Sequence, residues 1–532
     1  MWNKYRVTAT TFVLAMLLMV PQAFASAPKL SDAEMKDATK IYFQRCAGCH
    51  GTLRKGATGP NLEPKKTLDI GTDGLVDIIS EGTPGGMPNF VTGGTLTKAQ
   101  AGLMAKFIQN KPVAPPEMSL ADIKESWKVI VPVSKRPTKP QHNRNWQNFF
   151  GVVERDAGRV AIIDGDTKEI ITKVNSGYAV HILRTSASGR YFLSIGRDGK
   201  AGMIDTWMNP PAIVAEVKTC SEARSIDASK YKGYEDKYAI IGCYWPPHFV
   251  VVDGATLEPL KIVSTRGYTY DTFEYHPEPR VAAIVSSHYS PEWVLNIKET
   301  GYVWLVDYSN IDNLKISMIE GERFLHDGGW DATHRYFQSA ANMRDTMVII
   351  DTKERKRVAK IAVGTKPHPG RGANWVDPKF GPVSGTVHIG EGLLSVWGSD
   401  PKGHPKNAWK VVRSIELEPG AGSLFMKTHP KSKNLWLDFA LNTDKKNSRS
   451  VCVMKIDKPE AGIKCFQVAD HGRVVHMEYN KAGDEVWVSV WDNKGEIVIY
   501  DDKTLKEKAR ITKDLRTPTG KFNVYNTMHD IY

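Results

Sequence analysis

The feature that most constrains this chain is a pentapeptide near its N-terminus, Cys46-Ala-Gly-Cys-His50. Two thiols three positions apart and an adjacent imidazole form the pattern that attaches a c-type haem. On one helical turn both thiols can form thioethers with the haem vinyl groups, while the imidazole reaches the iron from the same side. Half of a tetrahedral zinc site would have the same pattern, but the chain has no second Cys-x-x-Cys or histidine pair to complete such a site. We therefore expect Cys46 and Cys49 to hold haem c covalently and His50 to ligate its iron.

A methionine in a Gly/Pro-rich loop is the expected second ligand of this iron. Met87 lies in Gly82-Thr-Pro-Gly-Gly-Met-Pro-Asn89, where no helix hinders the approach of its sulfur. A thioether is a weakly basic ligand that raises the potential of a haem iron. Ordinary loop packing is the alternative reading of Met87.

Helical patterns surround these residues. Ser31-Asp-Ala-Glu34 reads as a capping box, and an amphipathic helix is expected from Thr97 to Gln109. Residues 31–111 are therefore expected to fold as a small all-α class I cytochrome c domain. Residues 112–145 are rich in proline and read as a linker on or between domains.

The first residues read as a secretory signal peptide. Lys4 and Arg6 precede an apolar run, and an Ala-x-Ala site closes residues 1–25. No apolar run is long enough to span a bilayer, so we expect an exported, soluble protein. Loss of the leader lowers the formal charge from +12 to +10, which suits anionic substrates and an acidic redox partner. Nucleic-acid binding is not expected, because the basic residues are scattered.

Four further cysteines leave two possibilities open. Cys220 with Cys243 and Cys452 with Cys465 could form disulfides in an oxidising compartment. They could equally be buried free thiols, which pack as small hydrophobic side chains.

From residue 146 to residue 532 the chain repeats one phrase: an apolar strand, an aspartate, a turn and a charged strand. Val160-Ala-Ile-Ile-Asp164 and Val250-Val-Val-Asp253 are clear copies. The eight aspartates of the phrase are Asp164, Asp205, Asp253, Asp307, Asp351, Asp400, Asp457 and Asp501. Their spacing suits four-stranded propeller blades of about 40–50 residues, so the sequence predicts an all-β eight-bladed propeller.

Three histidines in this half have unusual surroundings. His181 begins a predicted strand, His326 lies among small residues, and His368 lies between two prolines. Any one of these histidines, taken alone, is more often a structural residue whose hydrogen bonds are made within the fold. Arginines recur near the blade ends, and several in one funnel would need a multiply anionic ligand. These arginines are Arg155, Arg197, Arg224 and Arg371.

Long phrases of the chain resemble the cytochrome cd1 nitrite reductases over essentially the whole mature length. The shared phrases are Tyr42-Phe-Gln-Arg-Cys-Ala-Gly-Cys-His-Gly51, Gly177-Tyr-Ala-Val-His181, Gly233-Tyr-Glu-Asp236, Tyr275-His-Pro-Glu-Pro-Arg280, Phe324-Leu-His-Asp-Gly-Gly-Trp330, His368-Pro-Gly-Arg-Gly-Ala-Asn374 and Thr517-Pro-Thr-Gly-Lys-Phe-Asn-Val-Tyr-Asn-Thr-Met-His529.

The resemblance implies a second haem, haem d1, held non-covalently in the propeller. His181 matches the axial ligand of the d1 iron, and His326 and His368 match the distal pair that donates protons. The positions that match the cofactor wall are Arg155, Arg197, Arg224, Tyr244, Arg371, Phe425, Trp491 and Gly520. The implied reaction is the one-electron reduction of nitrite to nitric oxide in the periplasm. The implied partners are a small cytochrome c or cupredoxin as electron donor, and a second copy in a homodimer.

Three rival functions have the same broad outline. A haem d1 biosynthesis dehydrogenase would share the architecture, although paired His326 and His368 favour the reductase. A quinone-cofactor dehydrogenase would require a vicinal Cys-Cys pair, which the chain lacks. A pure binding scaffold would leave the arginines and histidines unexplained.

The short segment before Cys46 yields a testable prediction. Some family members use an N-terminal arm to supply a histidine to haem c or a tyrosine to haem d1. Here the mature segment has no histidine, and its one tyrosine, Tyr42, lies within the predicted helix. We expect His50/Met87 ligation in both redox states and an open or water-bound d1 iron. Spectra of the oxidised and reduced protein that reveal a change from histidine to methionine on haem c would contradict this.

Overall fold

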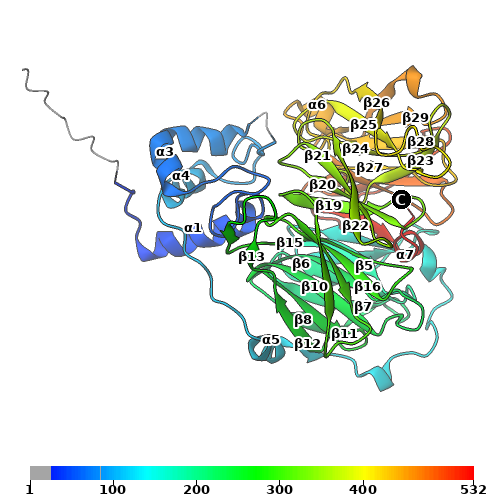
Figure 1. Cartoon of the computed structure of the whole chain (residues 1–532), viewed down its shortest axis with the longest axis horizontal. Coiled ribbons are helices and arrows are strands. Elements are labelled where there is room, and N and C mark those ends of the chain that lie inside the picture. The colour runs from blue at the N-terminus through cyan, green and yellow to red at the C-terminus, as the bar shows by residue number, and fades with distance from the viewer. Residues whose placement is uncertain (1–25, 84–85, 532) are drawn as a thin grey trace, which may run out of the picture.

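The computed structural model describes residues 26–83 and 86–531. The predicted signal peptide, residues 1–25, lies outside the described residues. Helices occupy the N-terminal part and strands almost all of the rest, as the sequence predicted (Figure 1). No helix in the described ranges is both long and apolar enough to cross a membrane.

The N-terminal helices surround the Cys-x-x-Cys-His motif. They are α1 (Asp32–Arg45), α2 (Ala47–His50), α3 (Pro64–Glu81) and α4 (Lys98–Ile108). Ser31 and Glu34 form the predicted capping box of α1, and Thr97 caps α4. The core between these helices includes Tyr42 and Met104, with Met87 packed at its edge.

Thirty-two strands of the described chain form eight four-stranded antiparallel blades. In the first four blades these are β35 (Pro518–Asn523), β2 (Phe150–Glu154), β3 (Arg159–Ile163) and β4 (Ile170–Asn175); β5 (Val180–Thr185), β6 (Tyr191–Gly196), β7 (Lys200–Asp205) and β8 (Ala212–Lys218); β9 (Glu222–Ala228), β10 (Tyr238–Trp245), β11 (His248–Asp253) and β12 (Pro259–Ser264); and β15 (Val281–Ser286), β16 (Glu292–Ile297), β17 (Tyr302–Asp307) and β18 (Lys315–Glu320). In the last four they are β19 (Leu325–Trp330), β20 (Tyr336–Ala341), β21 (Thr346–Asp351) and β22 (Lys356–Ala362); β23 (Ala373–Asp377), β24 (Gly381–Val387), β25 (Leu393–Gly398) and β26 (Val411–Glu416); β27 (Met426–Lys427), β28 (Asn434–Asp438), β29 (Ser450–Lys455) and β30 (Ile463–Gln467); and β31 (Arg473–Tyr479), β32 (Glu485–Trp491), β33 (Glu496–Asp501) and β34 (Glu507–Ile511).

The repeating aspartate has the same place in every blade. It ends the third strand or follows it within two residues, at the turn to the fourth strand. The carboxylate of Asp164 accepts hydrogen bonds from the backbone N–H groups of Asp166 and Thr167. Asp253 and Asp351 hold their turns in the same way. An aspartate is favoured there because its side chain replaces a missing backbone acceptor of the turn.

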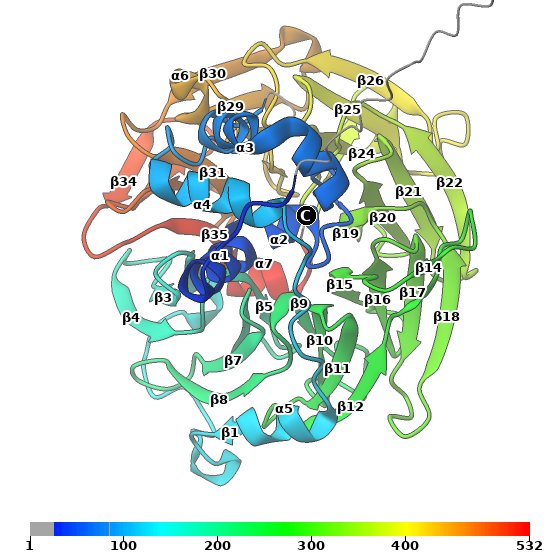
Figure 2. The same ribbon diagram turned by 90° about the vertical axis from the view of Figure 1, so that its left-hand side faces the viewer.

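The C-terminal strand closes the ring. β35 pairs with β2, so the first blade contains both ends of the propeller sequence. Figure 2 shows the blades as a ring, with helices α1 to α4 in front of its centre. At the seam, the rings of Phe150 and Trp487 are fully buried and stack with their centroids 3.9 Å apart. Each blade buries its faces only against its neighbours, and this seam completes that packing.

The proline-rich segment from 112 to 145 runs along the propeller. It carries α5 (Leu120–Ser126) and β1 (Lys128–Val129), and β1 pairs with β8 at the edge of a blade. Ile123 is buried in the core of that blade and its neighbour. Short 3₁₀ turns follow at Val133–Lys135 and Trp146–Asn148. The hairpin β13 (Gly267–Tyr268) and β14 (Tyr275–His276) projects beside β15, and α6 (Lys445–Ser448), a 3₁₀ turn (Pro459–Ala461) and α7 (Val524–Met528) complete the described elements.

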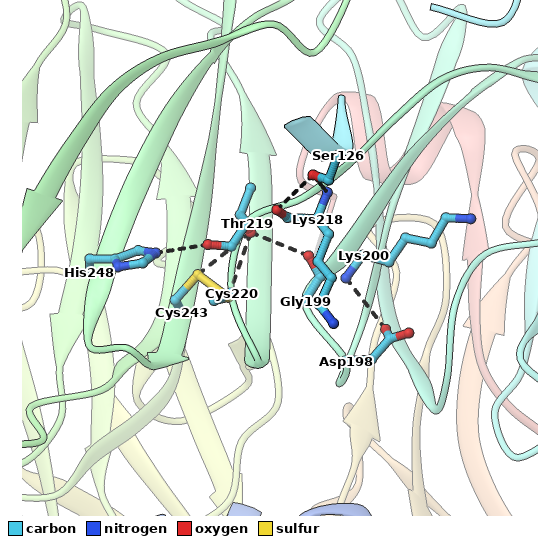
Figure 3. The surroundings of a disulfide bond; sticks show 9 residues. All are labelled: Ser126, Asp198, Gly199, Lys200, Lys218, Thr219, Cys220, Cys243 and His248. Carbon is cyan, nitrogen blue, oxygen red and sulfur yellow. Dashed lines mark hydrogen bonds between the residues drawn. A yellow bond between two sulfur atoms is a disulfide. The ribbon is translucent and has the colours of Figure 1, made fainter. Parts of the chain in front are cut away.

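The four cysteines left open by the sequence form two disulfides, Cys220–Cys243 and Cys452–Cys465. The Cys452–Cys465 bond joins the neighbouring strands β29 and β30 of one blade. The Cys220–Cys243 bond joins the loop before β9 to β10 of the same blade. Figure 3 shows Thr219 beside the first bond, its carbonyl hydrogen-bonded by the ring of His248. Because the sulfur atoms of Cys220 and Cys243 are bonded to each other, neither cysteine offers a thiolate to a metal beside His248.

The seam makes a prediction about stability. Trp487→Ala removes a buried ring that stacks across the closure, so the free energy of unfolding should fall by about 3–5 kcal/mol. Trp487→Phe keeps an aromatic partner for Phe150 and should lose clearly less. Guanidinium denaturation of the three proteins measures both effects. Equal losses in the two variants would mean that the stack does not hold the seam.

Candidate functional site

The Cys-x-x-Cys-His motif forms the short helix α2, with its imidazole turned inward. His50 is buried, and its Nδ1 lies 2.8 Å from the carbonyl oxygen of Pro60. Nδ1 therefore donates its hydrogen, which leaves Nε2 with a lone pair for a metal. Burial lowers the pKa of His50, so the ring is neutral. Gly59 is required beside it, because a Cβ there would come within 2.7 Å of the imidazole.

The Met87 loop lies across the same space. The backbone of Met87 pairs with Thr83 through a hydrogen bond of 3.0 Å from the Thr83 N–H to the Met87 carbonyl oxygen. Met87 and His50 both line one cavity, together with the two free cysteines, Cys46 and Cys49. Two thiols, an imidazole with a free nitrogen and a thioether are the donor set that a covalent haem c requires. The residues present thus fit this cofactor.

Two residues of the propeller hold helix α2 in place. The carboxylate of Glu278 accepts hydrogen bonds from the backbone N–H groups of Thr52 and Leu53, at 2.5 and 2.9 Å. The guanidinium of Arg280 donates to the carbonyl oxygens of Ala47 and Gly48, at 3.2 and 3.3 Å. We call Glu278 and Arg280 the clamp. It gives partners to the backbone N–H groups that follow the helix and adds hydrogen bonds to two of its carbonyl groups.

The clamp rests on a buried ion pair. Arg280 bonds to Glu299 through Nε and Nη2, at 2.8 and 2.6 Å, and both side chains are 1% exposed. Arg45 at the end of α1 adds a second contact to the propeller, an ion pair of 2.7 Å with Asp156. The motif is therefore fixed relative to the blades.

A cavity with a volume of about 440 Å³ lies between the two parts. The propeller side of its wall comes mainly from first strands, such as β5, β9, β19 and β35, and from loops that lead into them. It includes every propeller residue predicted for the site except one: His181, Arg155, Arg197, Arg224, His326, His368, Arg371, Phe425, Trp491 and Gly520. Tyr244 is the exception. It lies behind the wall, with Arg197 and Arg280 over its ring.

Cations dominate this wall. Eight described arginine and lysine side chains line the cavity against two carboxylates, those of Asp327 and Glu478. Sequence reasoning missed half of the eight, namely Arg45, Arg184, Lys366 and Lys427. Gly520 leaves the wall flat, and a Cβ there would meet the ring of Phe522 at 3.0 Å. A flat ligand with several carboxylates, such as haem d1, fits both the charge and the shape of this donor set.

His181 on β5 faces this cavity as a neutral imidazole. Burial, then the charges of Arg224, Arg197 and Arg155, hold its pKa well below the usual value. A neutral imidazole is the state in which histidine ligates a metal.

His326 and His368 lie together around Asp327, with ring centroids 5.3 Å apart. Nε2 of His368 lies 3.2 Å from one carboxylate oxygen of Asp327, and its Nδ1 lies 2.7 Å from the carbonyl oxygen of Leu424. The other Asp327 oxygen accepts from Arg224 at 2.7 Å. Burial opposes ionisation of Asp327, but His368 and Arg224 hold its pKa below the usual value.

The two imidazoles have opposite partners. Both ring nitrogens of His368 face acceptors, which suits a doubly protonated ring. Nε2 and Nδ1 of His326 instead face the donors Arg224 and Lys298, at 3.1 and 3.0 Å. Burial and these cations hold the pKa of His326 well below its usual value. Sequence reasoning missed Asp327, although it follows His326 directly, and Lys298, for which no motif gave a signal.

Known proteins resemble the chain in both parts. Residues 144–527 match the family described as "Cytochrome D1 heme domain", and residues 33–108 match "Cytochrome C oxidase, cbb3-type, subunit III". The chain is 52% identical to the nitrite reductase of Stutzerimonas stutzeri, over 97% of each protein. It is 27% identical to the dihydro-heme d1 dehydrogenase of Pseudomonas aeruginosa, over 93% of this chain and 95% of the relative.

A solved structure shares the architecture. The dihydro-heme d1 dehydrogenase NirN in complex with DHE superposes with a TM-score of 0.69 at 26% identity. The likeness covers 92% of this chain and 99% of that one.

The clamp predicts a pH dependence of stability. Burial raises the pKa of Glu278 from 4.5 to about 7. Between these values the unfolded chain has lost the proton that the folded chain keeps, so stability falls as pH rises through the window and levels off above it. Glu278→Gln cannot titrate, and its unfolding free energy should lack this fall, on the order of 3 kcal/mol.

Denaturation of both proteins from about pH 5 to pH 8 tests this. Glu81→Gln, at an exposed position of α3, is the matched control and should follow the parent protein. Parallel curves for Glu278→Gln and the parent would contradict the prediction.

Proposed function

The chain belongs to the cytochrome cd1 nitrite reductase family, and from this membership we propose that it reduces nitrite to nitric oxide at the propeller cavity. It contains haem c and haem d1 as cofactors. The observation that carries the proposal is the single cavity lined by the Cys-x-x-Cys-His motif, by the cationic wall and by the paired histidines. This arrangement supports the proposal, because electron entry at the motif and proton donation by the histidines would then meet around one anion-binding space.

We propose the following roles for the residues. Cys46 and Cys49 hold haem c, with His50 and Met87 as the ligands of its iron. His181 ligates the iron of haem d1. The residues that hold the d1 ring are Arg155, Arg197, Arg224, Tyr244, Arg371, Phe425, Trp491 and Gly520. Haem d1, when bound, supplies the iron that takes up nitrite and passes it the electron from haem c.

The protein supplies charge and protons. Reduction of one nitrite ion to nitric oxide consumes one electron and two protons and releases one water molecule. The cations of the wall attract the nitrite anion. His326 and His368 face the cavity and can each pass a proton to the departing oxygen, and a charged His368 also stabilises negative charge there. Asp327 orients His368 and Arg224 through the contacts described above.

Location and partners are part of the proposal. The leader pattern of residues 1–25 and the two disulfides support a periplasmic protein. A small cytochrome c or a cupredoxin would deliver electrons to haem c, and a homodimer is the proposed assembly.

The alternative activity is that of the dihydro-heme d1 dehydrogenase, which has the same architecture. The nitrite reductase is the much more similar relative, at 52% against 27% identity. Fold alone does not separate the two activities, so the test must measure turnover.

The test uses protein purified from the periplasm of a host that makes haem d1. After reduction and addition of nitrite, it should show the bands of both haems and release nitric oxide catalytically. His326→Ala and His368→Ala should each slow this release by about 10²–10⁴-fold, because each removes a positioned acid.

His404→Ala, at an exposed histidine, is the matched control and should keep the parent rate. Binding of haem d1 without nitric oxide release would assign the chain to the dehydrogenase activity. Full activity of both cavity variants would disprove the proton-donating roles.

A further inference from the structure

A buried lysine stands directly behind His326. Lys298 follows β16 and has no exposed surface, and its Nζ lies 3.0 Å from Nδ1 of His326. The same Nζ donates to the hydroxyl of Thr58, at 2.9 Å. Thr58 belongs to the loop beside the Cys-x-x-Cys-His motif and is half-buried at the edge of the cavity. Lys298 thus connects His326 with the helical part of the chain.

The partners of His326 restrict its hydrogens. Arg224 keeps its proton at any accessible pH, so an imidazole bonded to it must offer Nε2 as an acceptor. The hydrogen of the neutral ring is then on Nδ1, and Lys298 can accept it only as an uncharged amine. With a charged Lys298 the pattern reverses: Nδ1 accepts from the ammonium, Nε2 carries the hydrogen toward the cavity, and Arg224 gives up its bond to Nε2 and keeps the one to Asp327. Two self-consistent patterns therefore exist, and they differ by one proton.

The surroundings allow Lys298 to change between these patterns. Burial, followed by the charge of Arg280, lowers the pKa of Lys298 from 10.5 to about 7. The groups that act on it also include Glu299, which raises its pKa, Arg224, which lowers it, and the Cys49 thiol, whose charge is lost once it is bonded to haem c. His326 faces Arg224, Lys298, His368 and His181. Both the charged and the neutral amine are thus accessible near neutral pH.

Building on the proposed reaction, we propose that Lys298 is a positioning residue that recharges His326 as a proton relay. The Lys298 ammonium gives one proton to Nδ1 as Nε2 gives one proton to the departing oxygen in the cavity. The N–H bond of the ammonium and that of Nε2 break, and new bonds to hydrogen form at Nδ1 and at the departing oxygen. His326 is neutral before and after and changes only its tautomer. The resulting amine regains its proton from solvent beside the Thr58 hydroxyl, and a flip of the imidazole ring turns the new N–H toward the cavity and restores the starting pattern.

The first two variants separate charge from proton release. Lys298→Met removes both, whereas Lys298→Arg keeps a permanent cation that cannot release a proton. Lys353→Met, at an exposed position of the neighbouring blade, is the matched control. All are prepared with both haems, and nitric oxide release is measured between about pH 5.5 and pH 9.

The parent rate should fall as pH rises through about 7, because the relay needs the ammonium. Both Lys298 variants should lack this limb and be slower by about 10²-fold at low pH, while the control follows the parent. A parent-like profile in either variant would overturn the relay.

Hydrogen–deuterium exchange at the C2 position of each histidine, read by mass spectrometry, reports the titration of His326 without any turnover. Loss of the neighbouring cation in Lys298→Met should raise the midpoint of His326 by about one pH unit, and Lys298→Arg should not. An unchanged midpoint of His326 in Lys298→Met would show that Lys298 does not act on His326 and would overturn the relay. This result stands apart from the proposed function, which fails only if the parent holoenzyme releases no nitric oxide.

A third variant covers the case in which the Lys298 variants do not fold. Thr58→Val removes the acceptor of the ammonium but keeps the lysine. It disfavours the charged amine, so the limb in the pH profile should move to lower pH. A limb at the parent pH in this variant would also overturn the relay.

Discussion

The ion pair between Arg280 and Glu299 is the interaction on which the arrangement of the two parts depends. It is fully buried, and one end of Arg280 is aimed at carbonyl groups of the motif helix. A buried cation that lost its partner would be costly, so the guanidinium has little freedom to move away. The helix that carries the Cys-x-x-Cys-His motif is thereby placed over the cationic cavity, and one space can serve both cofactors.

The fold could be predicted because its signals are local. The phrase that ends in Asp164 or Asp351 sets a turn with its own carboxylate, and eight repeats predicted eight blades. The capping box at Ser31 located the first helix for the same reason. The disulfides could not be decided, since Cys220 and Cys243 could equally pack as thiols until the register of β10 placed them together.

The cavity was predictable only in part. His326 and His368 stand in unusual sequence surroundings, and the structure brings them to one carboxylate, that of Asp327. Lys298 has no such signal. Its partner Thr58 lies 240 positions away, so the contact exists only once the helical part has docked on the ring. Interactions that join distant segments are invisible to pattern and composition.

The closing strand has a consequence for the order in which the protein can be assembled. Gly520 on β35 and Trp491 on β32 belong to the end of the chain, and Arg155 to the start of the propeller, yet all three line one wall. A chain that still lacks its last residues lacks that wall and has an unpaired edge at β2. The complete wall of the cavity therefore exists only in the finished polypeptide, so a cofactor in the propeller can meet all of its contacts only after the last blade has formed.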